Sequence, residues 1–149
     1  MEYKSEEVTQ GLIDEILPLL MLHEKELNVS GRPLDPDYLT YIVADVKRQL
    51  AVYTVRDGEE KSVIGYAVYW LSRHPHYDIK VAQQDILFLH PAHRKGRVGI
   101  KLIKFSEKCL KEDHSVEMVL QHTKSHKSLE SLFQYLGYTE LETIYSKVL

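Results

Sequence analysis

Two long runs of strand-forming residues lie in the middle of the chain, and patterns typical of helices precede and follow them. The runs Val63–Leu71 and Ile79–Leu89 are rich in Val, Ile, Tyr, Trp and other apolar residues. Strands of this kind bury their apolar faces against other elements, and the flanking helices can cover them. The chain is therefore predicted to be α/β (α+β), with three layers in which helices pack on both faces of a mixed central sheet.

Apolar spacing predicts two helices before these strands. In Thr9–Leu27 apolar residues recur at helical spacing, and Pro18 is expected to kink the helix or to restart it. The segment Asn28–Pro33 is expected to break it. Asp35 then places a capping carboxylate ahead of Pro36, which suits the first position of a second helix.

The other elements follow from the same periodicities. Leu50–Arg56 is predicted to pair with Val63–Leu71 as an antiparallel hairpin, because Asp57-Gly58 lies between the two runs. The remaining elements are expected to be a helix from Val98 to Leu110, a strand over Val116–Gln121, a helix over Leu129–Leu136 closed by Gly137, and a last strand over Tyr138–Leu149.

Length and composition favour one soluble domain spanning residues 1–149. The 149 residues are 44% hydrophobic and 28% charged, which excludes disordered and fibrous classes. The longest apolar run, Ile16–Leu22, is too short for a membrane span, and the acidic start does not resemble a signal peptide. With the lone Cys109, this predicts a cytoplasmic protein. A net charge of -3 makes nucleic-acid binding unlikely.

The segment Asp85–Leu102 carries the most informative motif. A strand is expected to end at His90-Pro91, and the loop that follows holds three cations and two glycines before a helix begins. Unpaired N–H groups and the positive dipole end make a helix start an anion site, and glycines let the backbone approach a diphosphate closely. Taken alone, a loop with two glycines favours a solvated turn.

This segment resembles the acetyl-CoA signature of the GNAT N-acetyltransferases, commonly written Arg/Gln-x-x-Gly-x-Gly/Ala. Arg94 matches its first position and Gly99 its last, whereas Arg97 replaces the middle glycine. The resemblance covers most of the chain, since Phe133-Gln-Tyr-Leu-Gly-Tyr138 is similar to the family's Tyr-x-x-Leu-Gly-Phe segment. The Lys95-Gly-Arg-Val-Gly99 variant is similar to small members from bacteriophages, for which the compartment would be the host cytoplasm.

The resemblance implies an enzyme that moves an acetyl group from acetyl-CoA, a co-substrate, to a primary amine by direct attack. The acceptor could be a small molecule or a protein, and a homodimer formed through the C-terminal strand is an open alternative. His126 occupies the place of a family asparagine that contacts the cofactor arm. The implied cofactor-binding residues are Leu87, Phe88, Leu89, Arg94, Lys95, Gly96, Arg97, Val98, Gly99, Ile100 and His126.

Asp85 is the candidate general base. The alternating residues from Ile79 to Leu89 are expected to share one face of a strand, where Gln83 and Asp85 interrupt an apolar row. A buried carboxylate there needs a partner or a raised pKa, and either suits a base that takes a proton from an ammonium. A place at the sheet rim explains Asp85 equally well. Gln83 matches the position where some family members carry a catalytic glutamate.

The family's usual acid, a tyrosine four residues before the glycine of Leu-Gly-Phe, is replaced by Phe133. Tyr135 is the candidate for this catalytic role, with Tyr138 nearby, although helix geometry turns Tyr135 about 200° away from Phe133. A thiol pKa of about 8.5 would also let CoA thiolate leave without an acid.

Three further readings remain open. The missing motif glycine and tyrosine also fit a catalytically silent domain that binds CoA or a protein on the same fold. The basic residues of the two loops around Arg94 and Lys127 could form one basic mouth or two separate solvated turns. Acidic residues near the first two helices, among them Glu24, Glu26 and Asp35, suit either a cationic acceptor or a solvated face. The eight histidines show no metal-binding spacing, so no metal is expected.

Overall fold

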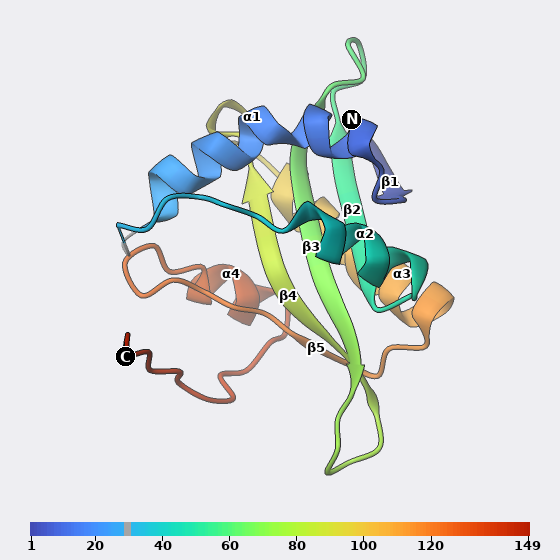
Figure 1. Cartoon of the computed structure of the whole chain (residues 1–149), viewed down its shortest axis with the longest axis vertical. Coiled ribbons are helices and arrows are strands. Elements are labelled where there is room, and N and C mark those ends of the chain that lie inside the picture. Colours follow the sequence, from blue (N-terminus) through green and yellow to red (C-terminus); the bar gives the residue numbers. More distant parts are fainter. Residues whose placement is uncertain (29–30) are drawn as a thin grey trace.

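A computed structural model describes residues 1–28 and 31–149, and its centre is one five-stranded sheet in the order β1-β2-β3-β4-β5. The strands from β1 to β4 pair antiparallel, whereas β5 pairs parallel to β4 (Figure 1). The strands are β1 (Glu2–Glu6), β2 (Leu50–Arg56), β3 (Val63–Arg73), β4 (Lys80–Leu89) and β5 (Met118–Leu120). The predicted mixed sheet and the β2–β3 hairpin are confirmed.

Helices cover both faces of this sheet, as predicted. The helices are α1 (Gln10–Leu27), α2 (Tyr38–Val46), α3 (Val98–His114) and α4 (Glu130–Tyr135), with a short 3-10 turn η1 (Pro91–His93). Tyr53 and Leu102 are fully buried in the core between the sheet and α3. Leu19 and Tyr66 are buried in the second core, between the sheet and the pair α1 and α2.

The ends of the first two helices differ in detail from the prediction. The α1 helix continues through Pro18 and is capped by Thr9, whose side chain accepts a hydrogen bond from the Leu12 N–H. The predicted break after α1 includes residues 29 and 30, which lie outside the described residues. Asp37, and not Asp35, caps α2, because the Asp37 carboxylate accepts from the Thr40 N–H at 3.1 Å.

The two ends of the chain differ from the prediction, because β1 was not predicted and the predicted last strand is wrong. The polar segment Glu2–Glu6 forms β1 by pairing with the edge of β2, although its sequence lacks an apolar run. The segment Tyr138–Leu149, predicted as a strand, joins no ladder, and Tyr145 is 90% exposed. Strand-forming residue types need a sheet edge to pair with, and the neighbouring edge strand β5 has only three residues.

A β-bulge in β4 decides which side chains face each core. Val68 pairs with Ile86 but Tyr69 pairs with Gln84, so Asp85 is the extra residue. The bulge changes the alternation: Leu87 and Leu89 pack against the α3 core, whereas Ile86 packs against the core under α1 and α2. The predicted single face running from Ile79 to Leu89 is therefore wrong, because a strand keeps its alternation only without an inserted residue.

No helix among residues 1–28 and 31–149 is long and apolar enough to cross a membrane.

Candidate active site

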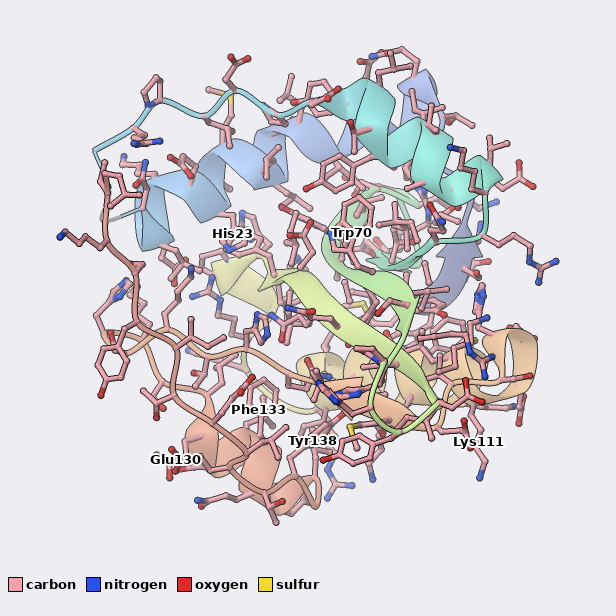
Figure 2. All side chains as sticks on the ribbon, turned by 60° about the horizontal axis from the view of Figure 1, so that its bottom comes forward. His23, Trp70, Lys111, Glu130, Phe133 and Tyr138 are labelled. Atoms are coloured by element: carbon pink, nitrogen blue, oxygen red, sulfur yellow. The ribbon has the colours of Figure 1, made fainter. Side chains whose placement is uncertain are left out.

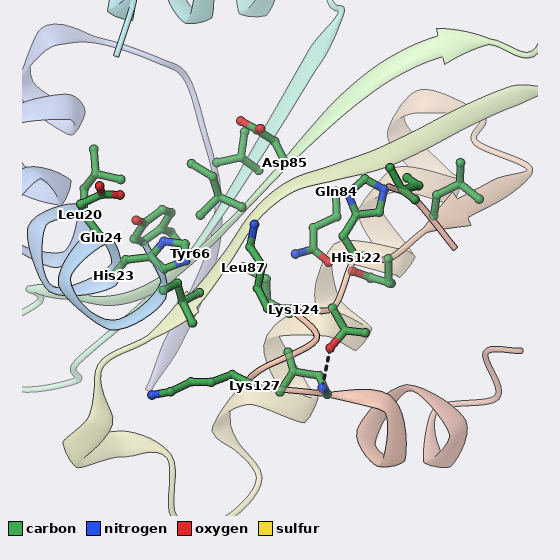
Figure 3. A pocket seen from close by; sticks show the side chains of 18 of the residues that line it. Leu20, His23, Glu24, Tyr66, Gln84, Asp85, Leu87, His122, Lys124 and Lys127 are labelled. Atoms are coloured by element: carbon green, nitrogen blue, oxygen red, sulfur yellow. Dashed lines mark hydrogen bonds between the residues drawn. The ribbon is translucent and has the colours of Figure 1, made fainter. Parts of the chain in front are cut away.

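The strands β4 and β5 separate soon after they begin to pair. Their ladder joins only Val81–Gln83 to Met118–Leu120. Beyond the ladder, a side chain takes the place of a backbone acceptor: the Gln84 Oε1 accepts a hydrogen bond from the His122 N–H at 3.0 Å. Figure 3 shows Gln84 and His122 side by side at this point. The edge of β4 that follows therefore faces a gap.

The backbone of β4 directs polar groups into this gap. The His90 N–H donates to the Ile64 carbonyl at 2.8 Å, on the β3 side. Because successive residues of an antiparallel ladder alternate in the edge that they address, the N–H and carbonyl of Leu89 point to the opposite edge. There the Leu89 carbonyl accepts from the Arg94 Nε at 2.9 Å. The same alternation directs the N–H of Leu87 into the gap.

The loop between β4 and α3 leaves several donors free. Gly96 has a φ of +94°, which is the left-handed region that glycine adopts without strain. The first hydrogen bond of α3 runs from the Lys101 N–H to the Arg97 carbonyl, so the N–H groups of the first turn have no intrahelical acceptor. The side chains of Lys95 and Arg97 are exposed and have no bonding partner among the described residues.

Arg94 is engaged differently from its neighbours. Its two terminal nitrogens donate to both oxygens of Glu26 on α1, at 2.7 and 2.6 Å, and its guanidinium lies over the Phe88 ring. The Nζ of Lys127 donates to the same carboxylate at 3.0 Å. The two basic loops around Arg94 and Lys127 therefore come together, but both cations are paired with the Glu26 carboxylate. The hydrogen bond from Arg94, followed by that from Lys127, lowers the pKa of Glu26 to about 2.

The variant Glu26→Gln is expected to lower the free energy of unfolding by about 1 kcal/mol near neutral pH. The effect is small because Arg94 and Lys127 are partly exposed and water screens the ion pairs. A carboxyl whose pKa is lower in the folded state stabilises the fold above its unfolded pKa and loses this effect as pH falls. Urea unfolding should show the difference from the parent narrowing from pH 4.5 towards about 2.

The exposed Glu59, in the turn between β2 and β3, offers a matched control for this measurement. The variant Glu59→Gln removes the same charge from a side chain that forms no ion pair with any described residue. Its unfolding free energy should differ little from that of the parent at any pH. A difference for Glu26→Gln that stays constant from pH 7 down to about 2 would contradict the ion-paired state of Glu26.

A cleft of about 1250 Å³ connects the gap with the space under α1 and α2. Asp85 lines it at the bulge, and the Tyr41 hydroxyl donates to the Asp85 Oδ2 at 2.7 Å. Figure 3 shows Asp85 above Leu87, with His23 and Tyr66 on the α1 side. Asp85 is exposed to the cleft and partnered. Of the two alternatives for Asp85, the buried carboxylate is therefore wrong and the exposed one is observed, because the bulge turns Asp85 out of the ladder.

No protein-family model matches the chain, and no curated protein matches it in sequence. Solved structures do match. A ribosomal-protein-alanine N-acetyltransferase from Brucella melitensis biovar Abortus 2308 superposes with a TM-score of 0.73 and 14% identity, over 100% of both chains. An aminoglycoside acetyltransferase from an uncultured soil metagenomic sample, in complex with sisomicin, gives a TM-score of 0.76 and 12% identity, over 99% of this chain and 95% of that chain.

A Trypanosoma brucei acetyltransferase superposes with a TM-score of 0.70 and 15% identity, over 99% of both chains. The superpositions cover essentially the whole chain. The chain has the GNAT fold. The similarity to bacteriophage members stays a prediction.

The GNAT fold brings together only some of the residues that the sequence singles out. Asp85 and Leu87 line the cleft, and Phe88 is buried beside it under the His23 ring, with centroids 4.7 Å apart. The residues of the loop and of the α3 start lie beyond the end of β4 (Figure 1). His126 is exposed in the turn between β5 and α4 and does not line the cleft.

The two tyrosines near α4, Tyr135 and Tyr138, have different surroundings. Tyr135 is 71% exposed and does not line the cleft, whereas Phe133 of the same helix does. Phe133 and Tyr138 lie side by side, with ring centroids 5.6 Å apart (Figure 2). The Tyr138 hydroxyl donates to the Glu107 carboxylate at 2.6 Å. The helix therefore directs Tyr135 away from the cleft, as the angle of about 200° implies.

Four residues of the cleft escape the sequence-based prediction: His23, Tyr41, Tyr66 and Gln84. His23 follows the apolar stripe of α1, where a lone histidine is ordinarily a packed core residue. Burial lowers the pKa of His23, which favours the neutral ring. A signal for Tyr41 and Tyr66 would have been their position on the apolar faces of α2 and β3. Within the described part of the chain, no group of three or more His, Cys, Asp or Glu side chains could hold a metal ion.

Proposed function

We propose that this chain transfers an acetyl group from acetyl-CoA to a primary amine. The observation that carries the proposal is the position of Asp85, a cleft-facing carboxylate at the bulge where β4 separates from β5. On one side of it lies a strand edge with free backbone donors, and on the other lies a cavity under α1 and α2. A thioester and an amine could reach this carboxylate from opposite sides.

The residues around the gap fit acetyl-CoA as a substrate. The N–H groups of Leu87 and Leu89 are oriented to bond an extended amide chain lying along the edge of β4, as a further strand would. The donors of the first turn of α3, with Gly99 and the side chains of Lys95 and Arg97, suit the diphosphate. Arg94 would contribute less than the motif implies, because Glu26 already holds its guanidinium.

In the proposed reaction Asp85 accepts a proton from the acceptor ammonium, directly or through one water. The neutral nitrogen then attacks the acetyl carbonyl, and the N–H of Leu89 stabilises the developing oxyanion. A C–N bond forms, the C–S bond breaks, and the thiolate of CoA leaves with the electron pair. The second proton of the nitrogen is lost as the amide forms and passes, through solvent, to the departing thiolate, which leaves as the thiol. Because a thiol pKa is about 8.5, the departure of the CoA thiolate requires no dedicated acid. His126 is proposed as a contact with the cofactor arm, whereas no catalytic role is proposed for Tyr135, which is exposed and does not line the cleft.

A second function, binding of CoA without catalysis, is favoured by one observation. The α4 residue that lines the cleft is Phe133, which has no proton to donate, and Tyr135 is exposed. This function shares the cofactor site with the first but lacks turnover.

Two measurements test the proposed function. Melting of the protein with and without acetyl-CoA should show stabilisation, and thiol release should accelerate in the presence of primary amines. Stabilisation without thiol release across a broad amine panel would support the silent domain. A melting temperature that acetyl-CoA leaves unchanged at millimolar concentration would reject both functions.

A further inference from the structure

The outer face of α2 is apolar, although it lies at the surface of the molecule. Leu39, Val43 and Val46 are three or four residues apart, so they share one face of the helix. Their exposed fractions are 68%, 40% and 78%. We call these three residues the α2 stripe. The opposite face of α2 carries Tyr41, which packs against the core under α1 and α2. The helix is therefore apolar on its inner and on its outer side.

The helix on the other face of the sheet has the usual polar outer side. All exposed residues of α3 are charged: Lys101, Lys104, Lys108, Lys111, Glu112 and Asp113. A helix with one face on a core ordinarily resembles α3, whereas a helix that is apolar all round is ordinarily covered all round. A contiguous exposed apolar patch marks an interaction site. We therefore expect a partner to cover the α2 stripe.

The helix α1 adds apolar area on the same side of the molecule. Its Leu17 and Met21 are exposed and lie opposite the buried Leu19 around the helix axis. Because α1 and α2 cover the same face of the sheet, their outer faces point to the same side (Figure 1). A stable interface buries about 800 Å² on each partner, which is more than a helix of nine residues offers alone. The outer face of α1 can supply the remainder.

Charges at the two ends of α2 indicate which partner fits. At the N-terminal end Asp37 is exposed, and its carboxylate accepts from the Thr40 Oγ1 at 2.6 Å, beside the α2 stripe. At the C-terminal end Lys47 and Arg48 are exposed, and neither forms an ion pair with a described residue. One end of the surface is thus acidic and the other is basic. Such a surface is complementary to a copy of itself turned end to end.

A second copy related by a two-fold axis meets this surface in an antiparallel orientation. With the axis beside Val43, Leu39 lies opposite Val46 of the second copy. The same register places Asp37 opposite Arg48 of the second copy. Each helix N-terminus also lies beside the C-terminus of the other helix, which the helix dipoles favour. A parallel orientation would instead bring like charges together at both ends.

We infer that the α2 stripe is the contact surface of a homodimer, in which α2 packs antiparallel against α2 of a second copy. Such a dimer is independent of the proposed function, because association requires neither a ligand nor turnover. The C-terminal segment lies near α4 and away from α2 (Figure 1), so a dimer formed through that segment would be a different one.

Sedimentation velocity of the full chain, from about 1 μM to about 500 μM, tests the dimer. The mass of the parent should approach twice the monomer mass of 17.4 kDa as its concentration rises. The variant Val43→Glu should raise the dimer Kd about 100-fold, because it opposes two carboxylates at the axis. Diluted to the monomer, it should melt close to the parent, since the outer face of α2 is then in water.

A double-mutant cycle tests the antiparallel orientation. Asp37→Asn removes the charge and keeps the helix cap, because asparagine caps a helix as well as aspartate does. Asp37→Asn and Arg48→Gln should each weaken the dimer about 5-fold at low salt, since each removes both copies of the pair. The double variant should lose little more than either single variant, because the two residues contact each other. These differences should shrink in about 1 M NaCl.

Tyr145→Glu is the matched control, because it adds the same charge at an exposed apolar position of the C-terminal segment. It should dimerise as the parent does. Should Val43→Glu fold poorly, Val46→Glu, at a more exposed position of the stripe, replaces it with the same expected loss.

Three outcomes would overturn the inference. A parent that stays monomeric at about 500 μM would reject the dimer and leave the α2 stripe to a different protein or to a lipid surface. Dissociation by Tyr145→Glu as strong as that by Val43→Glu would place the contact on the C-terminal segment. Losses for Asp37→Asn and Arg48→Gln that simply add in the double variant would reject the antiparallel orientation.

Discussion

Replacement of Gly99 by glutamate is expected to abolish the stabilisation of the fold by acetyl-CoA. A Cβ at Gly99 would lie 3.7 Å from the Leu89 Cδ2, an ordinary contact, so the free protein should accept a side chain there. A carboxylate in the first turn of α3 is also compatible with the helix dipole. The same carboxylate would repel a diphosphate at the free N–H groups of that turn and would fill the space beside them.

The size of the effect follows from linkage. A ligand at a hundredfold excess over its Kd stabilises the native state by about 2.7 kcal/mol, and Gly99→Glu should lose essentially all of it. Scanning calorimetry with and without acetyl-CoA measures the difference. Lys104→Glu makes a larger change of charge at an exposed position further along α3 and should keep the ligand-induced shift. A full shift in Gly99→Glu would place the cofactor elsewhere.

The parts of the fold that the sequence predicts are those defined by local pattern. The strand–loop–helix around Gly99 appears as expected because its apolar runs, proline and glycines act within a few residues of one another. The bulge at Asp85 was not predictable in this way. It depends on the register between β3 and β4, which a single strand sequence does not specify.

The candidate site was predictable to the same limited extent. The loop that we propose to bind the cofactor is contiguous in sequence, and so a motif could reveal it. The pairing of Arg94 with Glu26 joins residues 68 apart, and the bond from Tyr41 to Asp85 joins residues 44 apart. Such contacts follow from the packing of α1 and α2 on the sheet. A cation in a motif can therefore be neutralised by a helix that the motif does not include.

The variant Asp85→Asn is expected to lower turnover about 10²-fold or more at neutral pH while leaving the fold intact. Asparagine keeps the shape of the side chain and can still accept from the Tyr41 hydroxyl, but it cannot take a proton from an ammonium. Because Asp85 is exposed, no buried polar group is lost. Cofactor-induced stabilisation should match that of the parent.

The pH dependence of Asp85→Asn distinguishes a lost base from a lost contact. If Asp85 removes the proton, the rate of Asp85→Asn should recover as pH rises, because more of the amine is already neutral. Asp35→Asn is the matched control, because Asp35 lines the same cleft and the substitution removes the same charge. It should retain the turnover of the parent. An Asp85→Asn protein that binds acetyl-CoA and turns over at the parent rate between about pH 6 and pH 9 would remove Asp85 from the chemistry, and positioning alone would then have to account for the rate.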